Sequence, residues 1–128
     1  FTGTSLGFNS IASNSQTIVA VGDDGIIYTS FNTINWFPQS STVANTLTNI
    51  IWDSYNNKFV AVGHNGVILT GTSDGITWTQ QTSGVTSILE STVWNNDAEQ
   101  YVVVGRDNAI LTSPNAITWT ISATFETS

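Results

Sequence analysis

One ten-residue phrase occurs three times in this chain, and its spacing constrains the fold more than any other feature. The phrase reads AVGDDGIIYT from Ala20 to Thr29, AVGHNGVILT from Ala61 to Thr70 and VVGRDNAILT from Val103 to Thr112. A tryptophan follows each copy, and the period is about 41 residues. A fixed period of this length is typical of repeat architectures, in which each repeat is one supersecondary unit. The sequence therefore predicts three units, approximately 1–43, 44–84 and 85–128.

Each unit contains four segments that resemble β-strands. In the middle unit they are segment A (Leu47–Trp52), segment B (Phe59–Gly63), segment C (Val67–Thr70) and segment D (Ile76–Gln80). β-Branched and aromatic residues dominate these segments, and none shows the period of a helix. Segment B is a short continuous apolar run, which predicts a strand buried on both faces. We align segment A with Gly7–Ala12 in the first unit and Leu89–Trp94 in the third.

The turns between segments B and C favour tight hairpins. They contain Asp24-Gly25, Asn65-Gly66 and Asp107-Asn108, pairs that tolerate the positive φ angles of such turns. Four antiparallel strands in each unit of about 41 residues predict an all-β fold built from β-propeller blades. A β-solenoid is the first alternative, although its coils are usually shorter. A single β-sandwich is the second, although nothing in a sandwich requires this period.

The link between segments C and D also repeats, as SFNTINW (Ser30–Trp36), TSDGITW (Thr72–Trp78) and SPNAITW (Ser113–Trp119). This link resembles the Asp box of bacterial-neuraminidase-type repeats, Ser-x-Asp-x-Gly-x-Thr-Trp. The middle copy matches best, although it is one residue shorter than the full pattern, and the outer copies are degenerate. The whole chain resembles Asp-box β-propellers, which include photosystem II assembly factors and secreted or phage-borne repeat proteins.

The resemblance implies an architectural role for the residues of this link. Hydroxyl and Asx side chains in such a turn bond nearby backbone groups, and the tryptophan covers the hairpin. The positions concerned are Ser30, Asn32, Trp36, Thr72, Asp74, Trp78, Ser113, Asn115 and Trp119.

Three blades are too few to close a propeller, which typically has four to eight. An open arc leaves an apolar blade face bare at each end, and this predicts association. Two chains that pair as a two-fold dimer would give six blades. Alternatively, further blades lie elsewhere in a longer propeller. The near-integral number of units favours the first arrangement, and the lack of methionine favours a fragment or processed piece; we expect self-association.

Composition and charge exclude several classes of partner. The net charge is −7 and the basic residues are Lys58 and Arg106, so the chain lacks the basic patch needed for nucleic acid or anionic lipid. No apolar run approaches the roughly 20 residues of a membrane span. The chain has no cysteine, which excludes disulfides and thiolate metal sites. A charge-poor, hydroxyl-rich composition favours an extracellular, virion or cell-surface location.

The sequence predicts no catalytic residues, no cofactor and no metal site. The Asp-box resemblance raises the question of a sialidase, but Arg106 alone cannot provide the arginine clamp that such enzymes use. The basic patch of photosystem assembly factors is missing too. His64 has no histidine neighbour, the tyrosines Tyr28, Tyr55 and Tyr101 show no evident partner base, and the acids, including Asp53, fall in expected turns. A glycoside hydrolase therefore remains a distant alternative.

Two groups of residues are candidates for ligand binding. Asp23-Asp24, His64-Asn65 and Arg106-Asp107 occupy equivalent turns on one rim, and varied side chains on a constant frame suit recognition. The alternative is that these turn tips tolerate any polar residue. Trp52 and Trp94, with Ala12 at the aligned position of the first unit, either form stacking platforms or pack between blades.

These residues favour a non-catalytic module that binds glycan or protein. A structural or assembly component of a virion or surface fibre is the main alternative.

Overall fold

The computed structural model describes residues 6–122, which form three four-stranded antiparallel sheets. Blade 1 consists of β1 (Phe8–Ser13), β2 (Ile18–Gly22), β3 (Ile27–Ser30) and β4 (Phe37–Gln39). Blade 2 consists of β5 (Leu47–Asp53), β6 (Lys58–Gly63), β7 (Ile68–Gly71) and β8 (Trp78–Gln81). Blade 3 consists of β9 (Leu89–Asn95), β10 (Gln100–Gly105), β11 (Ile110–Ser113) and β12 (Thr120–Ile121). The all-β prediction with four antiparallel strands in each unit is confirmed.

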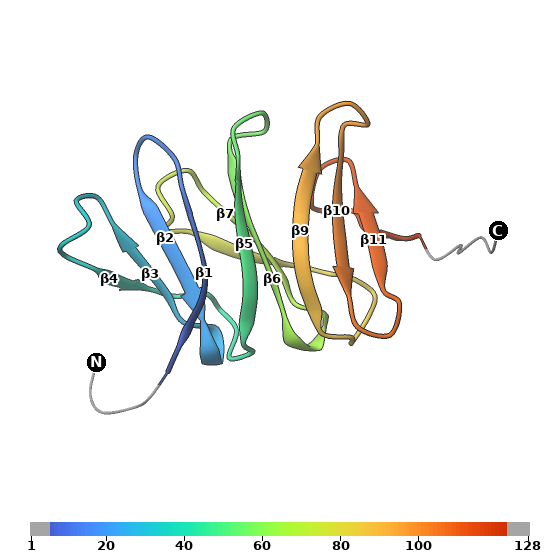
Figure 1. Cartoon of the computed structure of the whole chain (residues 1–128), viewed down its shortest axis with the longest axis horizontal. Coiled ribbons are helices and arrows are strands. Elements are labelled where there is room, and N and C mark those ends of the chain that lie inside the picture. The colour runs from blue at the N-terminus through green and yellow to red at the C-terminus, as the bar shows by residue number, and fades with distance from the viewer. Residues whose placement is uncertain (1–5, 123–128) are drawn as a thin grey trace.

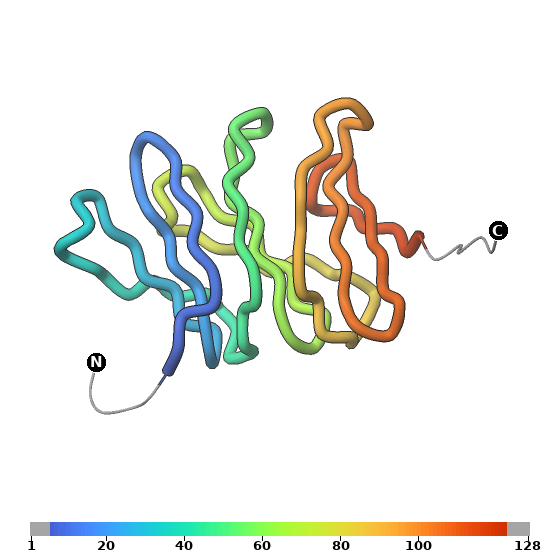
Figure 2. The backbone as a smooth tube through the Cα atoms, viewed as in Figure 1, coloured from blue at the N-terminus to red at the C-terminus, as the bar shows by residue number. Residues whose placement is uncertain are grey.

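The three sheets stand face to face in a row, with blade 2 in the middle (Figure 1). Within each sheet the strands pair in chain order. The first strands of successive blades, β1, β5 and β9, are neighbours along one side of the row. Figure 2 shows the chain completing one blade before it enters the next. This is the arrangement of β-propeller blades, with the first strand of each blade innermost.

The hydrophobic core lies in the two interfaces between the blades. Between blades 1 and 2, Val19 and Val21 meet Phe59 and Leu69. Between blades 2 and 3, the cluster joins the β-branched residues Val60, Val62 and Ile68 to Tyr101, Val103 and Leu111. Because side chains alternate along a strand, β6 supplies residues to both clusters and is buried on both faces. Each large apolar side chain buried in this way contributes about 1.5–3 kcal/mol.

The prediction of a doubly buried segment B is wrong for blade 3. Val104 is 42% exposed and Val102 is partly exposed. No strand among residues 6–122 packs on this face of blade 3, so the side chains that point there remain accessible.

Strand pairing corrects the alignment of the first strands. Trp52 lies opposite Phe59 in blade 2 and Trp94 lies opposite Tyr101 in blade 3. In blade 1 the equivalent pair is Ser13 with Ile18, so the residue at the tryptophan position is Ser13 and not Ala12. The first hairpin of blade 1 is two residues shorter than those of the other blades, and the alignment with Ala12 allows for only one of them.

The fourth strands begin later than segment D predicts. β8 begins at Trp78, two residues after Ile76, and β4 and β12 begin just beyond their tryptophans. The residues before each tryptophan belong to a turn that side-chain hydrogen bonds hold.

The hairpin turns between the second and third strands adopt the expected positive φ angles. Asp24 and Asn65 have φ values of 56° and 57°, and each precedes a glycine whose φ is also positive. In blade 3, Asp107 and Asn108 have φ values of 59° and 58°. Backbone amides of each turn donate hydrogen bonds to the residues just before the first strand of the same blade or of the next blade. The hairpin turns and the links between blades therefore share one rim, as expected.

Thr92 is an exception in the core between blades 2 and 3. Its side chain is 3% exposed, and its Oγ1 is the buried side-chain polar atom that lacks a hydrogen-bond partner within residues 6–122. Isoleucines occupy the same pairing position in the other blades, at Ile11 and Ile50. A buried hydroxyl without a partner costs free energy that an apolar group of the same shape does not.

We expect Thr92→Val to raise the free energy of unfolding by about 1 kcal/mol, because valine keeps the shape and removes the unbonded oxygen. Urea denaturation followed by tryptophan fluorescence measures this change, with Thr112→Val at a partly exposed strand position as the control. A lower midpoint for Thr92→Val than for the wild type would show that the hydroxyl has a partner.

Candidate functional site

The turns that resemble Asp boxes are held by their own side chains. In blade 3, Ser113 Oγ accepts a hydrogen bond from the Ala116 amide at 2.8 Å, and Asn115 Oδ1 accepts those of Ile117 and Thr118 at 2.8 and 2.9 Å. The turn of blade 1 has the same pattern around Ser30 and Asn32.

In blade 2 the pattern is carried by a charged residue. The Thr72 hydroxyl donates to Asp74 Oδ1 at 2.6 Å and the Ile76 amide donates to the same oxygen at 3.0 Å. The hydroxyl and then the amide hold the pKa of Asp74 below its ordinary value.

The three tryptophans of these turns differ in burial. Trp78 is buried, its Nε1 donates to the Gly75 carbonyl at 2.7 Å, and its ring lies against the backbone of Gly71. Trp119 is partly buried and makes the equivalent bond to Ala116 at 3.0 Å. Trp36 remains exposed on blade 1. The contacts of these turns are local or lie between blades.

The first candidate site is a pocket of about 480 Å³ on the rim of the hairpin turns. We call it the turn pocket; its lining residues are Asn9, Asp23, Thr46, Thr48, His64, Ile88, Glu90 and Arg106. The pocket brings together Asp23, His64 and Arg106, the first positions of the three aligned turns. Asp24, Asn65 and Asp107 do not line it.

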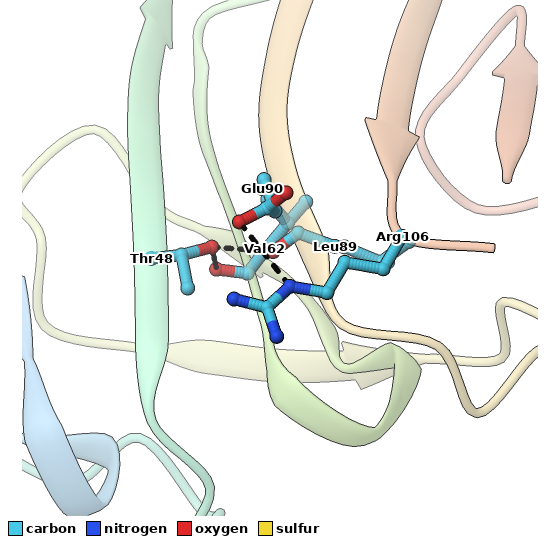
Figure 3. Close-up of polar contacts among 5 residues, drawn as sticks. All are labelled: Thr48, Val62, Leu89, Glu90 and Arg106. Atoms are coloured by element: carbon cyan, nitrogen blue, oxygen red, sulfur yellow. Dashed lines mark hydrogen bonds and ion pairs between the residues drawn. The ribbon is translucent and has the colours of Figure 1, made fainter. Parts of the chain in front are cut away.

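The charged groups of the turn pocket already have partners within the chain. Arg106 Nε lies 3.7 Å from Glu90 Oε1, with both side chains more than half exposed, and such surface pairs contribute about 0–1 kcal/mol. Figure 3 shows the guanidinium extending toward Thr48, whose hydroxyl donates to the Leu89 carbonyl at 2.5 Å. Asp23 Oδ2 accepts the Gly7 amide at 2.9 Å. Of the side chains that vary between the turns, Asp23 and Arg106 are therefore partly committed to structure.

The second candidate site is a groove of about 670 Å³ between the first hairpins of blades 2 and 3. We call it the aromatic groove; it is lined by Ile51, Trp52, Asp53, Ser54, Tyr55, Val93, Trp94 and Asn96. Trp52 and Trp94, from different blades, line the same groove. The Trp52 ring also packs on Phe59 at a centroid distance of 4.8 Å, and the Trp94 ring on Tyr101 at 4.7 Å. Each indole therefore both packs on the core and lines the groove.

Tyr55 is a member of the aromatic groove that sequence reasoning missed. It is 62% exposed, and its ring stacks on Trp94 with centroids 5.6 Å apart and an interplanar angle of 22°. Its hydroxyl donates to Glu99 at 3.4 Å, and Trp94 Nε1 donates to Asn96 Oδ1 at 3.3 Å. The signal available was its place in the hairpin, two residues after Asp53, but the other two units have no tyrosine there.

A buried polar network supports the floor of the aromatic groove. Asp53 is 3% exposed and accepts hydrogen bonds from the Tyr101 hydroxyl, the Asn56 side-chain amide at 2.6 Å and the Tyr55 backbone amide at 2.9 Å. Burial, and next the Asp53 carboxylate, raise the pKa of Tyr101 far above its ordinary value. Tyr101 is thus held protonated and out of reach of solvent.

This network corrects two expectations. Asp53 does not lie in an exposed turn, because it is the last residue of β5. Tyr101 has a partner carboxylate, which comes from the neighbouring blade.

Within residues 6–122, no three His, Asp or Glu side chains gather in a way that could hold a metal ion. The same residues include no helix of the length and hydrophobicity needed to cross a membrane.

The chain matches no known family model and no curated protein sequence. Its structure is similar to that of "YCF48 bound to D1 peptide", with a TM-score of 0.74 and 13% identity over 92% of this chain and 41% of the other. YCF48 from Cyanidioschyzon merolae is similar with a TM-score of 0.68 and 15% identity, over 89% of this chain and 39% of that one. The chain thus spans about two fifths of these proteins. At such identities the likeness shows the fold, which is that of a β-propeller.

Proposed function

We propose that this protein is a non-catalytic module that binds a peptide segment of a partner protein in the aromatic groove. The observation that carries the proposal is the stack of the exposed Tyr55 on the partly buried Trp94 in a groove between two blades. A protein of the same fold, YCF48, has been solved bound to a D1 peptide, which supports a peptide as the class of ligand.

The chemistry of the groove suits a short peptide. Tyrosine and tryptophan rings give large apolar contact at low cost in side-chain entropy, and they are enriched among residues that dominate binding energy. Ser54 and Asn96 lie beside the rings and offer hydrogen-bonding groups to a peptide backbone. The net charge of −7 favours a neutral or basic segment over an acidic one.

A glycan is the second candidate ligand for the same groove. The pairing of the Trp94 ring with the Asn96 amide favours it, because a sugar offers an apolar face to a ring and hydroxyl groups to an amide. The experiment below separates the two ligands.

We expect Tyr55→Ala to weaken binding of a selected peptide by tenfold or more, because it removes half of the stacked pair. Peptides are selected on the wild-type chain from a displayed random library, and the dissociation constants are measured by calorimetry. Phe31→Ala is the matched control, because Phe31 is a similarly exposed aromatic residue (61%) outside the groove.

Three outcomes contradict the peptide proposal. The library yields no binder, Tyr55→Ala binds as tightly as the wild type, or Phe31→Ala weakens binding equally. In the first case, a glycan array that gives Tyr55-dependent binding would assign the groove to sugar.

A further inference from the structure

Blade 2 shows how a blade of this protein buries both of its faces. Blade 1 covers the face that carries Leu47, Ile50 and Trp78, which are 0%, 3% and 4% exposed. Blade 3 covers the opposite face, which carries Val62 and Ile68 at 0%. Strand pairing identifies the equivalent residues on the outer blades, so their exposure can be compared position by position.

The outward face of blade 1 is equivalent to the face of blade 2 that blade 1 covers, but no described strand covers it. We call it the open face of blade 1. Phe8, Ile11 and Trp36, the counterparts of Leu47, Ile50 and Trp78, are 52%, 61% and 37% exposed. The face is hollowed by a groove of about 680 Å³, lined by Leu6, Phe8, Asn9, Ser10, Ile11, Ala20, Tyr28 and Trp36. None of these residues is charged.

The outward face of blade 3 is equivalent to the face of blade 2 that blade 3 covers, but no described strand covers it. We call it the open face of blade 3. Val104 is the counterpart of Val62 and is 42% exposed, and Ile110, the counterpart of Ile68, is partly exposed. Val93 on β9 extends the same face and is 53% exposed. This face is β-branched and has no aromatic ring among these residues.

The two internal interfaces follow one rule of packing. In each, a face that carries aromatic residues meets a face that carries valines. Phe59 packs on the side of Val19 and Val21, and Tyr101 packs on the side of Val60 and Val62. Large residues against small ones fill such an interface without voids.

The same rule identifies what fits the open faces. The open face of blade 1 carries the large residues Phe8, Tyr28 and Trp36, and the open face of blade 3 carries Val93, Val102 and Val104. Two open faces of blade 1 would set large residues against large ones, whereas a face of blade 1 on a face of blade 3 repeats the internal interfaces.

We propose that blade 3 of one copy of this chain packs on blade 1 of a second copy, and that two copies close a six-bladed ring. Both contacts of such a ring are the same head-to-tail contact, related by a two-fold axis along the ring axis. Six is the only multiple of three within the usual range of four to eight blades. Val93 borders both the aromatic groove and the open face of blade 3. The test residues Tyr55, Ile11 and Val104 each belong to one site alone, so either proposal can fail without the other.

Charge substitutions on the two faces test the head-to-tail contact by native mass spectrometry. The wild type is expected as a dimer. Ile11→Lys on blade 1 and Val104→Lys on blade 3 are each expected to give monomers, because each buries an unpaired charge in both contacts of the ring. Both residues are exposed in the single chain, so circular dichroism is expected to stay unchanged. Ile76→Lys is the control: Ile76 is 48% exposed even though blade 2 is covered on both sides, and this variant is expected to remain dimeric.

Three results would overturn the proposal. A folded wild-type monomer excludes the contact. Dissociation by one of the two variants alone indicates pairing of like faces. A series of masses at three, four and more copies indicates an open chain in place of a ring.

Discussion

Replacement of Asp53 by alanine is expected to lower the free energy of unfolding by about 3–5 kcal/mol. The carboxylate is buried and accepts bonds from two side chains and from the backbone at Tyr55. Alanine leaves the Tyr101 hydroxyl and the Asn56 amide without this acceptor in the interface between blades 2 and 3, and a buried polar group without a partner costs about 1–3 kcal/mol. The free energy of unfolding of a domain of this size is about 5–15 kcal/mol in total, so the expected loss is a large fraction of it.

Two further variants separate the network from its individual bonds. Tyr101→Phe keeps the ring and removes one donor, and a cost of about 1–2 kcal/mol is expected. Asp97→Ala removes a carboxylate that is exposed in the hairpin between β9 and β10, and a change within about 0.5 kcal/mol is expected. Urea denaturation followed by tryptophan fluorescence measures all three. If Asp53→Ala unfolds at the same urea concentration as Asp97→Ala, the network does not join the blades.

Gly63→Ala is expected to lower the free energy of unfolding by more than about 3 kcal/mol. A Cβ at this position would lie 2.1 Å from the Thr46 carbonyl oxygen, a backbone atom that cannot rotate away. The same carbonyl accepts the His64 amide at 2.9 Å, so the added methyl group forces this contact apart. The φ angle of Gly63 is −169°, which any residue adopts, so the cost is steric. Gly22 and Gly105 make the same close approach in the other blades.

Gly84→Ala is the matched control, because Gly84 has open space around its Cα and a φ of +84°. It is expected to cost about 1 kcal/mol from the backbone angle alone. Thermal unfolding measured by calorimetry compares the two variants. Equal losses would show that the close approach at Gly63 is relieved by a small shift of the backbone.

The architecture could be predicted from the sequence because its causes are local. The apolar phrase from Ala61 to Thr70 contains a strand, a turn with positive φ at Asn65 and a returning strand, and three copies of it define the period. These properties depend on neighbouring residues, and the all-β prediction with four strands in each unit is therefore correct.

The aromatic groove and its supporting network depend on contacts between blades, which a repeat alignment does not show. Asp53 bonds Tyr101 of the next blade, yet the residue aligned with Tyr101 in blade 2 is Phe59, which has no hydroxyl. The alignment marks such a position as merely aromatic. Val104 is exposed for a related reason: its burial depends on what lies beyond blade 3 and not on its own strand.

Sedimentation equilibrium of the unaltered chain over a range of concentrations tests most directly whether the open faces of blades 1 and 3 cover each other. The chain has a mass of 13.7 kDa, and the ring of two copies predicts twice that value as the single folded species. A mass of 13.7 kDa at every concentration, with an intact near-ultraviolet circular dichroism spectrum, would contradict it.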